Sequence, residues 1–318
     1  QIHFLGTSSG CPSKYRNVSA TAVQFERNKA WLLVDCGDGT QQKIMQAGLS
    51  LFHLNAVFIT HGHGDHCFGV PGLLSSVHLA GRKQPLWLVA PQRVIDFVLH
   101  ALCLTEVELG FQLQAKAWEP MLKISEPLQL EQCQVTLHPL QHRTTSVAFK
   151  IRESHVPRRL YVEKLRQHGI ARGSHLALLQ QGLDADYAGK RLLAAQYSYL
   201  YWRPRTVLIA GDNENPNLLQ SACADVDLLV HEATFTSTDL ARMTKATGHS
   251  CAKRIAEFAE RVAVPHLVLF HFSARYHGPG MLQPLAAEAK AYYHGQLTLA
   301  DDGLCLNVTK QLQDTDIP

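Results

Sequence analysis

Three histidines and one aspartate lie within six consecutive residues, His61-Gly62-His63-Gly64-Asp65-His66. This segment directly follows Ala56–Thr60, a short apolar and β-branched run that is typical of a buried strand. Imidazole nitrogens and carboxylate oxygens are the donors that Zn²⁺ and similar divalent ions bind. A tight turn after the strand directs positions i and i+2 toward one ion and positions i+4 and i+5 toward another. The motif therefore predicts a two-metal site at the end of a buried strand.

Other candidate ligands also follow apolar runs. Three runs lead directly into an aspartate or a histidine: Thr206–Gly211 into Asp212, Asp227–Val230 into His231, and His266–Phe270 into His271. His142 supplies a further donor. Helical patterns lie between the runs, at Gln41–Ala47, Phe68–Ala80, Gln92–Leu102, Asn217–Cys223, Cys251–Val262 and Leu285–Tyr293. This alternation predicts a layered α/β fold, in which sites gather beyond the carboxyl ends of the strands.

These donors favour hydrolytic chemistry. Two divalent ions about 3.5–4 Å apart activate a water between them and stabilise the attacking and leaving oxygens of a displacement. Asp212 is a short carboxylate behind a glycine, which suits a ligand shared by both ions. Asp65 can ligate one ion and also accept the proton of the attacking water. We expect His249, paired with Glu232, to protonate the leaving group; the alternative for His249 is a helix-capping role at the surface.

Composition excludes two broad classes of protein. Hydrophobic residues make up 46% of the 318 residues and charged residues 18%, and the apolar runs stay far below the ~20 residues that cross a bilayer. A membrane-spanning or disordered chain is therefore excluded. The first residues lack a basic region followed by an apolar stretch, and the eight cysteines form no C-x-x-C pair. We therefore expect a cytoplasmic protein.

Positive charge is concentrated in residues 153–205. This stretch contains nine Lys/Arg and four Asp/Glu, a net charge of +5, against +3 for the whole chain. It also contains five of the nine tyrosines, a mixture suited to phosphate contacts and base stacking, with a solvated face as the alternative. Weaker helical patterns near Leu160–His168 and His175–Gln181 interrupt the strand alternation. We therefore expect residues 153–205 to form a projecting arm, inserted into a single domain that spans residues 1–318.

Several motifs resemble one family of metal-dependent hydrolases. The H-x-H-x-D-H motif resembles the metallo-β-lactamase superfamily. A narrower resemblance, to short-form ribonuclease Z, rests on Phe4–Ser8 with Pro12 and Arg16-Asn17, and on Asp35–Gln41, Phe68–Leu74, His231–Thr234 and His271–Tyr276. It extends over nearly the whole chain. The resemblance implies an αββα sandwich that binds one or two metal ions at one edge of its sheets.

The resemblance also implies a ligand set and catalytic roles. One zinc ion would be held by His61, His63, His142 and Asp212. A second would be held by Asp65, His66, Asp212 and His271, with Mn²⁺ or another divalent metal as the alternative to Zn²⁺. Asp65 would be the base, and Glu232 and His249 the acid pair. His231 would orient Asp212 or another ligand.

The substrate that the resemblance implies is precursor tRNA, from which such enzymes remove the 3′ trailer. Ser273 and Arg275 fall where these enzymes contact the phosphate. The loop Pro12–Asn17, with Arg16 and Asn17, falls where they read the mature 3′ end. The resemblance further implies a homodimer in which the arm of one subunit presents tRNA to the site of the other.

The arm departs from the family pattern. Many members carry G-P-x-x-x-x-L-K-x-G, whereas Gly173–Gly182 keeps both glycines and Leu179 but lacks the proline and the lysine. Asp38 replaces a glutamate and Asn213 a threonine, and neither change removes a ligand. Two alternatives therefore stay open: a hydrolase of small phosphodiesters, aryl esters or sulfates, and an RNA-binding protein without catalysis.

Overall fold

The computed structural model describes residues 1–26, 29–124 and 126–312 of the chain. The chain divides into two compact units. The first unit comprises Gln1–Leu130, Gln134–Ile151 and Thr206–Val308. The second comprises Glu131–Cys133, Arg152–Arg205 and the C-terminal segment that begins at Thr309. Most of the second unit is therefore one insertion between two stretches of the first.

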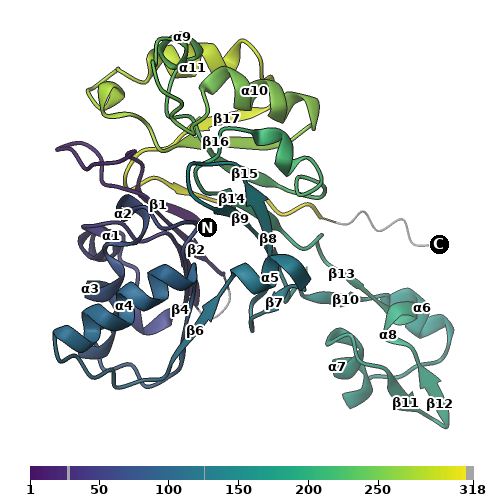
Figure 1. The fold of residues 1–318 in the computed structure, drawn as a ribbon. Coiled ribbons are helices and arrows are strands. Elements are labelled where there is room, and N and C mark those ends of the chain that lie inside the picture. Colours follow the sequence, from purple (N-terminus) through teal and green to yellow (C-terminus); the bar gives the residue numbers. More distant parts are fainter. Residues whose placement is uncertain (27–28, 125, 313–318) are drawn as a thin grey trace. The chain divides into compact units, whose positions relative to one another are not determined.

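The first sheet combines an antiparallel half with a parallel half. Within the described residues it has seven strands, in the order β18-β1-β2-β3-β4-β5-β6. Four of them, β1, β2, β4 and β6, are labelled in Figure 1. They are β1 (Ile2–Gly6), β2 (Ala20–Gln24), β3 (Trp31–Val34), β4 (Leu54–Phe58), β5 (Leu86–Ala90), β6 (Leu113–Ala117) and β18 (Cys305–Leu306). Strands β3 to β6 run parallel. The accompanying helices are α1 (Thr40–Gln46), η1 (Leu51–His53), α2 (Gly64–Cys67), α3 (Val70–Leu79), α4 (Gln92–Leu104) and α5 (Glu119–Ile124).

The second sheet is built in the same way. Its seven strands among the described residues follow the order β17-β16-β15-β14-β9-β8-β7. They are β7 (Leu128–Gln129), β8 (Cys133–Leu140), β9 (Ser146–Glu153), β14 (Thr206–Ala210), β15 (Leu228–Glu232), β16 (His266–Phe270) and β17 (Gln296–Leu299). Strands β14 to β17 run parallel. The accompanying helices are η2 (Pro216–Leu219), α9 (Ser237–Ala241), α10 (Ala252–Arg261), η3 (Ala274–Tyr276) and α11 (Gln283–Lys290).

The two sheets pack face to face. Leu33, Val57 and Leu88 of the first sheet share a core with helices α1, α3 and α4. Phe58, one residue beyond Val57, instead contacts Phe149 of β9, with 5.0 Å between the ring centroids. Because successive side chains of a strand point to opposite faces, each sheet buries one face under helices and the other against its neighbour. The expected αββα sandwich is confirmed.

Helix α10 illustrates how the second sheet is covered. Four of its buried side chains follow the i, i+3, i+4, i+7 spacing of a one-sided helix: Ala252, Ile255, Ala256 and Ala259. They share a core with Leu208 of β14 and Leu229 of β15. The small alanine side chains let the helix lie close to the sheet.

The second unit has a small core of its own. Its elements are β10 (Arg158–Leu160), α6 (Val162–Gln167), α7 (Ser174–Gln180), β11 (Ala185–Tyr187), β12 (Lys190–Leu192), α8 (Ala194–Tyr197) and β13 (Ser198–Leu200). Strand β10 pairs antiparallel with β13, and β11 with β12. Leu165, Leu179 and Tyr197 are buried between them. That residues 153–205 act as an arm that binds tRNA stays a prediction.

The second glycine of the Gly173–Gly182 segment has a structural role at the end of α7. Gly182 has a φ of +80°, a conformation that glycine adopts without strain. Its N–H donates to the carbonyl of Leu179, and the next N–H donates to the carbonyl of Leu178. This pattern is a glycine C-cap, so Gly182 serves to end the helix.

Some expected elements differ from those observed. The helix expected over Phe68–Ala80 begins only at Val70. The helix expected over Asn217–Cys223 is limited to the 3-10 helix η2, because Asn215 caps the N–H of Asn217 and turns follow Leu219. Within the described parts of the chain, no helix combines the length and the apolar character that crossing a membrane requires.

Candidate metal centre

The loop after β4 and the short helix α2 carry the histidine motif. His61 and His63 lie in the loop, and Asp65 and His66 lie in the first turn of α2. The segment packs against the loop that follows β3, where a Cβ on Gly37 would overlap the carbonyl oxygen of Asp65. Gly37 is therefore required for the close approach of the two loops.

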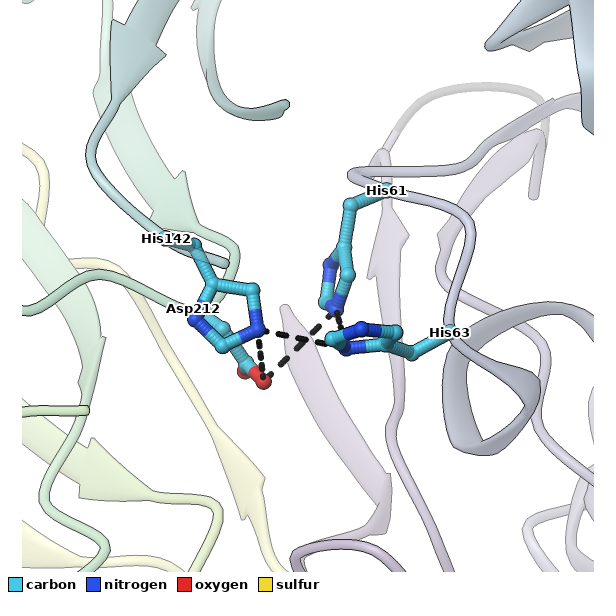
Figure 2. Close-up of side chains that lie close together, drawn as sticks. All are labelled: His61, His63, His142 and Asp212. Carbon is cyan, nitrogen blue, oxygen red and sulfur yellow. Dashed lines mark hydrogen bonds and ion pairs between the residues drawn. The ribbon is translucent and has the colours of Figure 1, made fainter. Parts of the chain in front are cut away.

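Four side chains from both sheets form a first cluster (Figure 2). Nδ1 of His63 lies 3.1 Å from Nε2 of His61 and 3.2 Å from Nε2 of His142. Oδ2 of Asp212 lies 3.6 Å from each of the same two Nε2 atoms. Ligands 2.0–2.2 Å from a tetrahedral zinc ion lie roughly 3.3–3.6 Å from one another. The cluster therefore has the dimensions of a metal site.

A second cluster lies beside the first. Nε2 of His66 is 3.5 Å from Oδ2 of Asp65 and 3.5 Å from Oδ1 of Asp212. Nε2 of His271, which follows β16, is 3.5 Å from the same Asp65 oxygen and 3.2 Å from the same Asp212 oxygen. The two carboxylate oxygens of Asp212 thus face different clusters, as a ligand shared by two ions requires.

Three polar atoms that face the second cluster have no hydrogen-bond partner among the described residues. Nε2 of His66, Nε2 of His271 and Oδ1 of Asp212 are buried without a hydrogen bond. Buried polar groups are normally hydrogen-bonded, so three such atoms in one place fit bound cations. Burial, and next the neighbouring His66, lowers the pKa of His61 well below its usual value. His61 is therefore neutral, the form that binds metal.

Hydrogen bonds to the outer ring nitrogens orient two of the histidines. Nδ1 of His142 donates to the carbonyl of Gly248 at 2.7 Å, and Nδ1 of His66 donates to Oδ2 of Asp35 at 2.7 Å. Each bond leaves Nε2 free to face its cluster. The sequence analysis missed both partners. Asp35 directly follows strand β3, so the strand-end pattern that revealed Asp212 also marks it.

We expect Asp35→Asn to weaken metal binding about 10- to 100-fold, the usual effect of removing such a partner. The carboxylate accepts from His66 and the Thr60 hydroxyl at Oδ2 and from the Thr60 N–H at Oδ1, whereas an amide has only one oxygen that can accept. Competition with a chelator would measure the affinity. The control is Asp38→Asn, which alters an exposed carboxylate of the same loop. Equal affinities of the two variants would contradict the role of Asp35.

The Glu232–His249 pair adjoins the first cluster. Nδ1 of His249 lies 3.0 Å from Oε1 of Glu232 and 3.7 Å from Oδ2 of Asp212. Although burial acts in the opposite direction, the Glu232 carboxylate raises the pKa of His249 to about 9. With this pKa, His249 holds a proton at neutral pH. His249 lies in a loop and does not cap α10, which begins after Cys251.

A cleft of about 440 Å³ opens beside this pair. His249, Thr234 and Ser273 line it, together with the cationic side chains of Arg143 and Lys245. The cleft therefore offers a proton donor and positive charge to a phosphodiester. Arg275 does not line it: the guanidinium lies over the ring of Phe235 at 5.2 Å and 3.8 Å from Asp239.

Arg16 and Asn17 are buried and bonded within the protein. Arg16 donates to the Thr7 hydroxyl at 2.6 Å and to the carbonyl of Ala300 at 2.9 Å. The Asn17 amide donates to the carbonyl of Asp38 at 2.9 Å. Their contact with substrate stays a prediction. The connection between β1 and β2, which includes Arg16 and Asn17, does reach the metal centre through its backbone, because the N–H of Gly10 donates to Oδ2 of Asp65 at 2.7 Å.

His231 lies next to the metal centre, and its role in orienting Asp212 or another ligand stays a prediction. Its Nε2 lies 3.0 Å from the amide nitrogen of Asn213, and its Nδ1 donates to the carbonyl of Glu232 at 2.8 Å. Asn213 in turn donates its N–H to Glu232 at 2.9 Å. His231 therefore bonds to Asn213, the residue next to Asp212, and makes no direct bond to the carboxylate of Asp212.

Comparison with known proteins identifies the family. The chain is 44% identical over 303 residues to a ribonuclease Z of Pseudomonas putida, and the alignment covers 94% of each protein. The chain belongs to the ribonuclease Z family. A ribonuclease Z of Marinobacter nauticus is 38% identical, with 98% of each protein covered. The crystal structure of the short form of human tRNase Z matches with a TM-score of 0.67 and 26% identity, over 97% of this chain and 99% of that one.

A family model described as anti-Pycsar protein Apyc1 matches residues 1–157, which include the histidine motif. Membership of the ribonuclease Z family confirms the expected enzyme class, a metal-dependent endoribonuclease with the metallo-β-lactamase fold. Asn213 stands where the ribonuclease Z pattern has a threonine. It leaves the neighbouring Asp212 unchanged, and its side chain bonds to His231.

Proposed function

We propose that the protein removes the 3′ trailer from precursor tRNA with two zinc ions, leaving a 3′-hydroxyl on the tRNA. The observation that carries this proposal is the position of Asp212, whose Oδ2 faces the first cluster and whose Oδ1 faces the second. The first ion would be held by His61, His63, His142 and Asp212, and the second by Asp65, His66, Asp212 and His271. Membership of the ribonuclease Z family supports the substrate.

The protein's own side chains would divide the remaining work. Two bound divalent ions would activate a water and polarise the phosphodiester. Asp65, held by the N–H of Gly10, would accept the proton of the water. His249, kept protonated by Glu232, would donate a proton to the ribose oxygen that leaves. Ser273 would bind the phosphate within the cleft, with Arg275 at its margin.

We also propose the assembly and location that the resemblance implies. Residues 153–205 would bind the tRNA body through their excess of positive charge. Exposed apolar side chains on α1, α3 and α4 would support a homodimer; among them are Met45, Leu79, Phe97 and Leu104. All eight cysteines are free, which agrees with a reducing cytoplasm.

The test compares two substrates of the purified, metal-loaded protein: precursor tRNA and bis(p-nitrophenyl) phosphate. We expect cleavage of the RNA at the start of the trailer, with an affinity that falls as salt rises by a log–log slope of about −0.7 to −0.9 per phosphate contact. Hydrolysis of the small ester should respond little to salt. Turnover of the ester without cleavage of the RNA would instead favour a hydrolase of small phosphodiesters.

A further inference from the structure

The ribbon formed by β10 and β13 has two chemically different faces. In its register Arg158 lies opposite Leu200, Arg159 opposite Tyr199, and Leu160 opposite Ser198. The pairing continues on both sides, because the N–H of Tyr201 donates to the carbonyl of Pro157 and that of Tyr161 to the carbonyl of Tyr197. Side chains alternate between the faces, so one face carries Arg159, Tyr161, Tyr199 and Tyr201.

The opposite face belongs to the core of the second unit. Leu160 packs against that core. The Oγ of Ser198 lies 2.8 and 2.7 Å from the carbonyl oxygens of Leu179 and Ala194, to which its one O–H can donate, and it accepts a bond from Nε of Arg158. The helices α7 and α8 therefore cover this side of the ribbon, and the other face is not needed for their packing.

The four side chains of the first face form a continuous row, which we call the aromatic row: Tyr161, Tyr199, Arg159 and Tyr201. The rings of Tyr161 and Tyr199 lie 4.8 Å apart with an angle of 33° between their planes. The guanidinium of Arg159 lies 3.3 Å from the centroid of Tyr201. Arg159 is exposed and the three tyrosines are partly exposed. The row thus presents flat surfaces to solvent at two neighbouring positions.

The charge of the row favours an anionic partner. The side chain of Arg159 has no ion pair or hydrogen bond among the described residues. Its guanidinium stacks on the ring of Tyr201. Residues 153–205 carry a net charge of +5. Single-stranded nucleic acid combines a negative backbone with bases that stack on tyrosine rings and on guanidinium planes. Single-stranded nucleic acid therefore fits both the flat groups of the row and the unpaired cation of Arg159 better than a folded protein would.

We propose that the aromatic row binds unpaired nucleotides of RNA by stacking, one base on the Tyr161–Tyr199 pair and a neighbouring base on Arg159. The inference rests on the proposed function, because it takes the RNA to be part of the substrate, and it assigns to this face the single-stranded part of the precursor rather than its helical stems. Stems have their bases stacked internally and present only phosphates to such a surface.

The experiment uses the full chain and a single-stranded RNA dodecamer of uridines with one central 2-aminopurine, whose fluorescence is quenched when it stacks on an aromatic ring. We expect wild-type protein to quench the probe on binding. Tyr199→Ala should abolish most of the quenching and weaken binding about 5- to 150-fold, the range for loss of one stacked base. Tyr199→Phe should retain both, because the ring is kept.

The matched control is Tyr292→Ala, which removes an exposed tyrosine in the turn after α11 that also lies under a cation, with Lys253 at 4.7 Å. This variant should bind and quench like wild type. Thermal unfolding of each variant would establish that it is folded. Unquenched probe on wild-type protein, or equal loss in Tyr199→Ala and Tyr292→Ala, would overturn the inference. Cleavage of precursor tRNA by the wild type would then show that the proposed function stands without it.

Discussion

Replacing Asp212 with alanine is expected to remove both metal ions and to reduce hydrolysis of every substrate to background. The carboxylate provides Oδ2 to the first cluster and Oδ1 to the second, so one substitution deletes a ligand from each. Metal analysis of both proteins is the decisive measurement: we expect two ions per chain in the wild type and none in Asp212→Ala. The metal content of Asp212→Asn should lie between that of the wild type and that of Asp212→Ala, because the amide offers one oxygen and no charge.

The control for Asp212→Ala is Asp227→Ala. Asp227 is also a buried aspartate of the second sheet, and it accepts a bond from the N–H of Thr206 at 2.7 Å at the far end of β14. Its loss should lower stability but leave the metal content unchanged. Asp212→Ala protein that still carries two ions per chain would show that the carboxylate is not shared.

Replacing His249 with alanine is expected to slow cleavage of precursor tRNA by about 10²- to 10⁴-fold, the usual contribution of general acid catalysis. Nδ1 of His249 is bound to Glu232, and Nε2 has no protein partner among the described residues while the ring lines the cleft. A ribose oxygen is a poor leaving group and needs this proton. A nitrophenolate leaves without protonation, so bis(p-nitrophenyl) phosphate should be affected far less.

A second histidine provides a close control for this variant. His294 makes the same Nδ1–carboxylate contact, 3.0 Å from Oε1 of Glu260, but at the surface. His294→Ala should leave both activities unchanged. Equal losses on the two substrates in His249→Ala would remove the residue from the acid role and indicate that it supports the geometry of the metal centre instead.

The strands that the sequence analysis expected are apolar on both faces, although β5, which is equally apolar, was not among them. Strands β4, β14 and β16 are buried almost throughout, so their continuous apolar runs are visible without knowledge of their neighbours. Strand β8 was missed because its buried and exposed residues mix, with Gln134, Thr136 and His138 among them. Whether such a strand forms depends on the sheet it joins, which local sequence does not specify.

The candidate ligands could be predicted from the sequence, and the groups that orient them could not. Histidines and aspartates at strand ends signal a site by residue type and position alone. The bonds that orient them often come from backbone groups, such as the carbonyl of Gly248 behind His142 and the N–H of Gly10 on Asp65. Every residue has a carbonyl and all but proline an N–H, so residue type gives no sign of which group lies at the right place.

Each cluster combines side chains from the segment after β4 of one sheet with side chains at strand ends of the other, so ions bound there would join the two halves of the sandwich. Ions that bind only the folded chain add their binding free energy to that of folding, about 2.7 kcal/mol for one site at a hundred times its dissociation constant. We therefore expect the folded protein to become more resistant to proteases as the free metal concentration rises, because bound ions would hold the two sheets together.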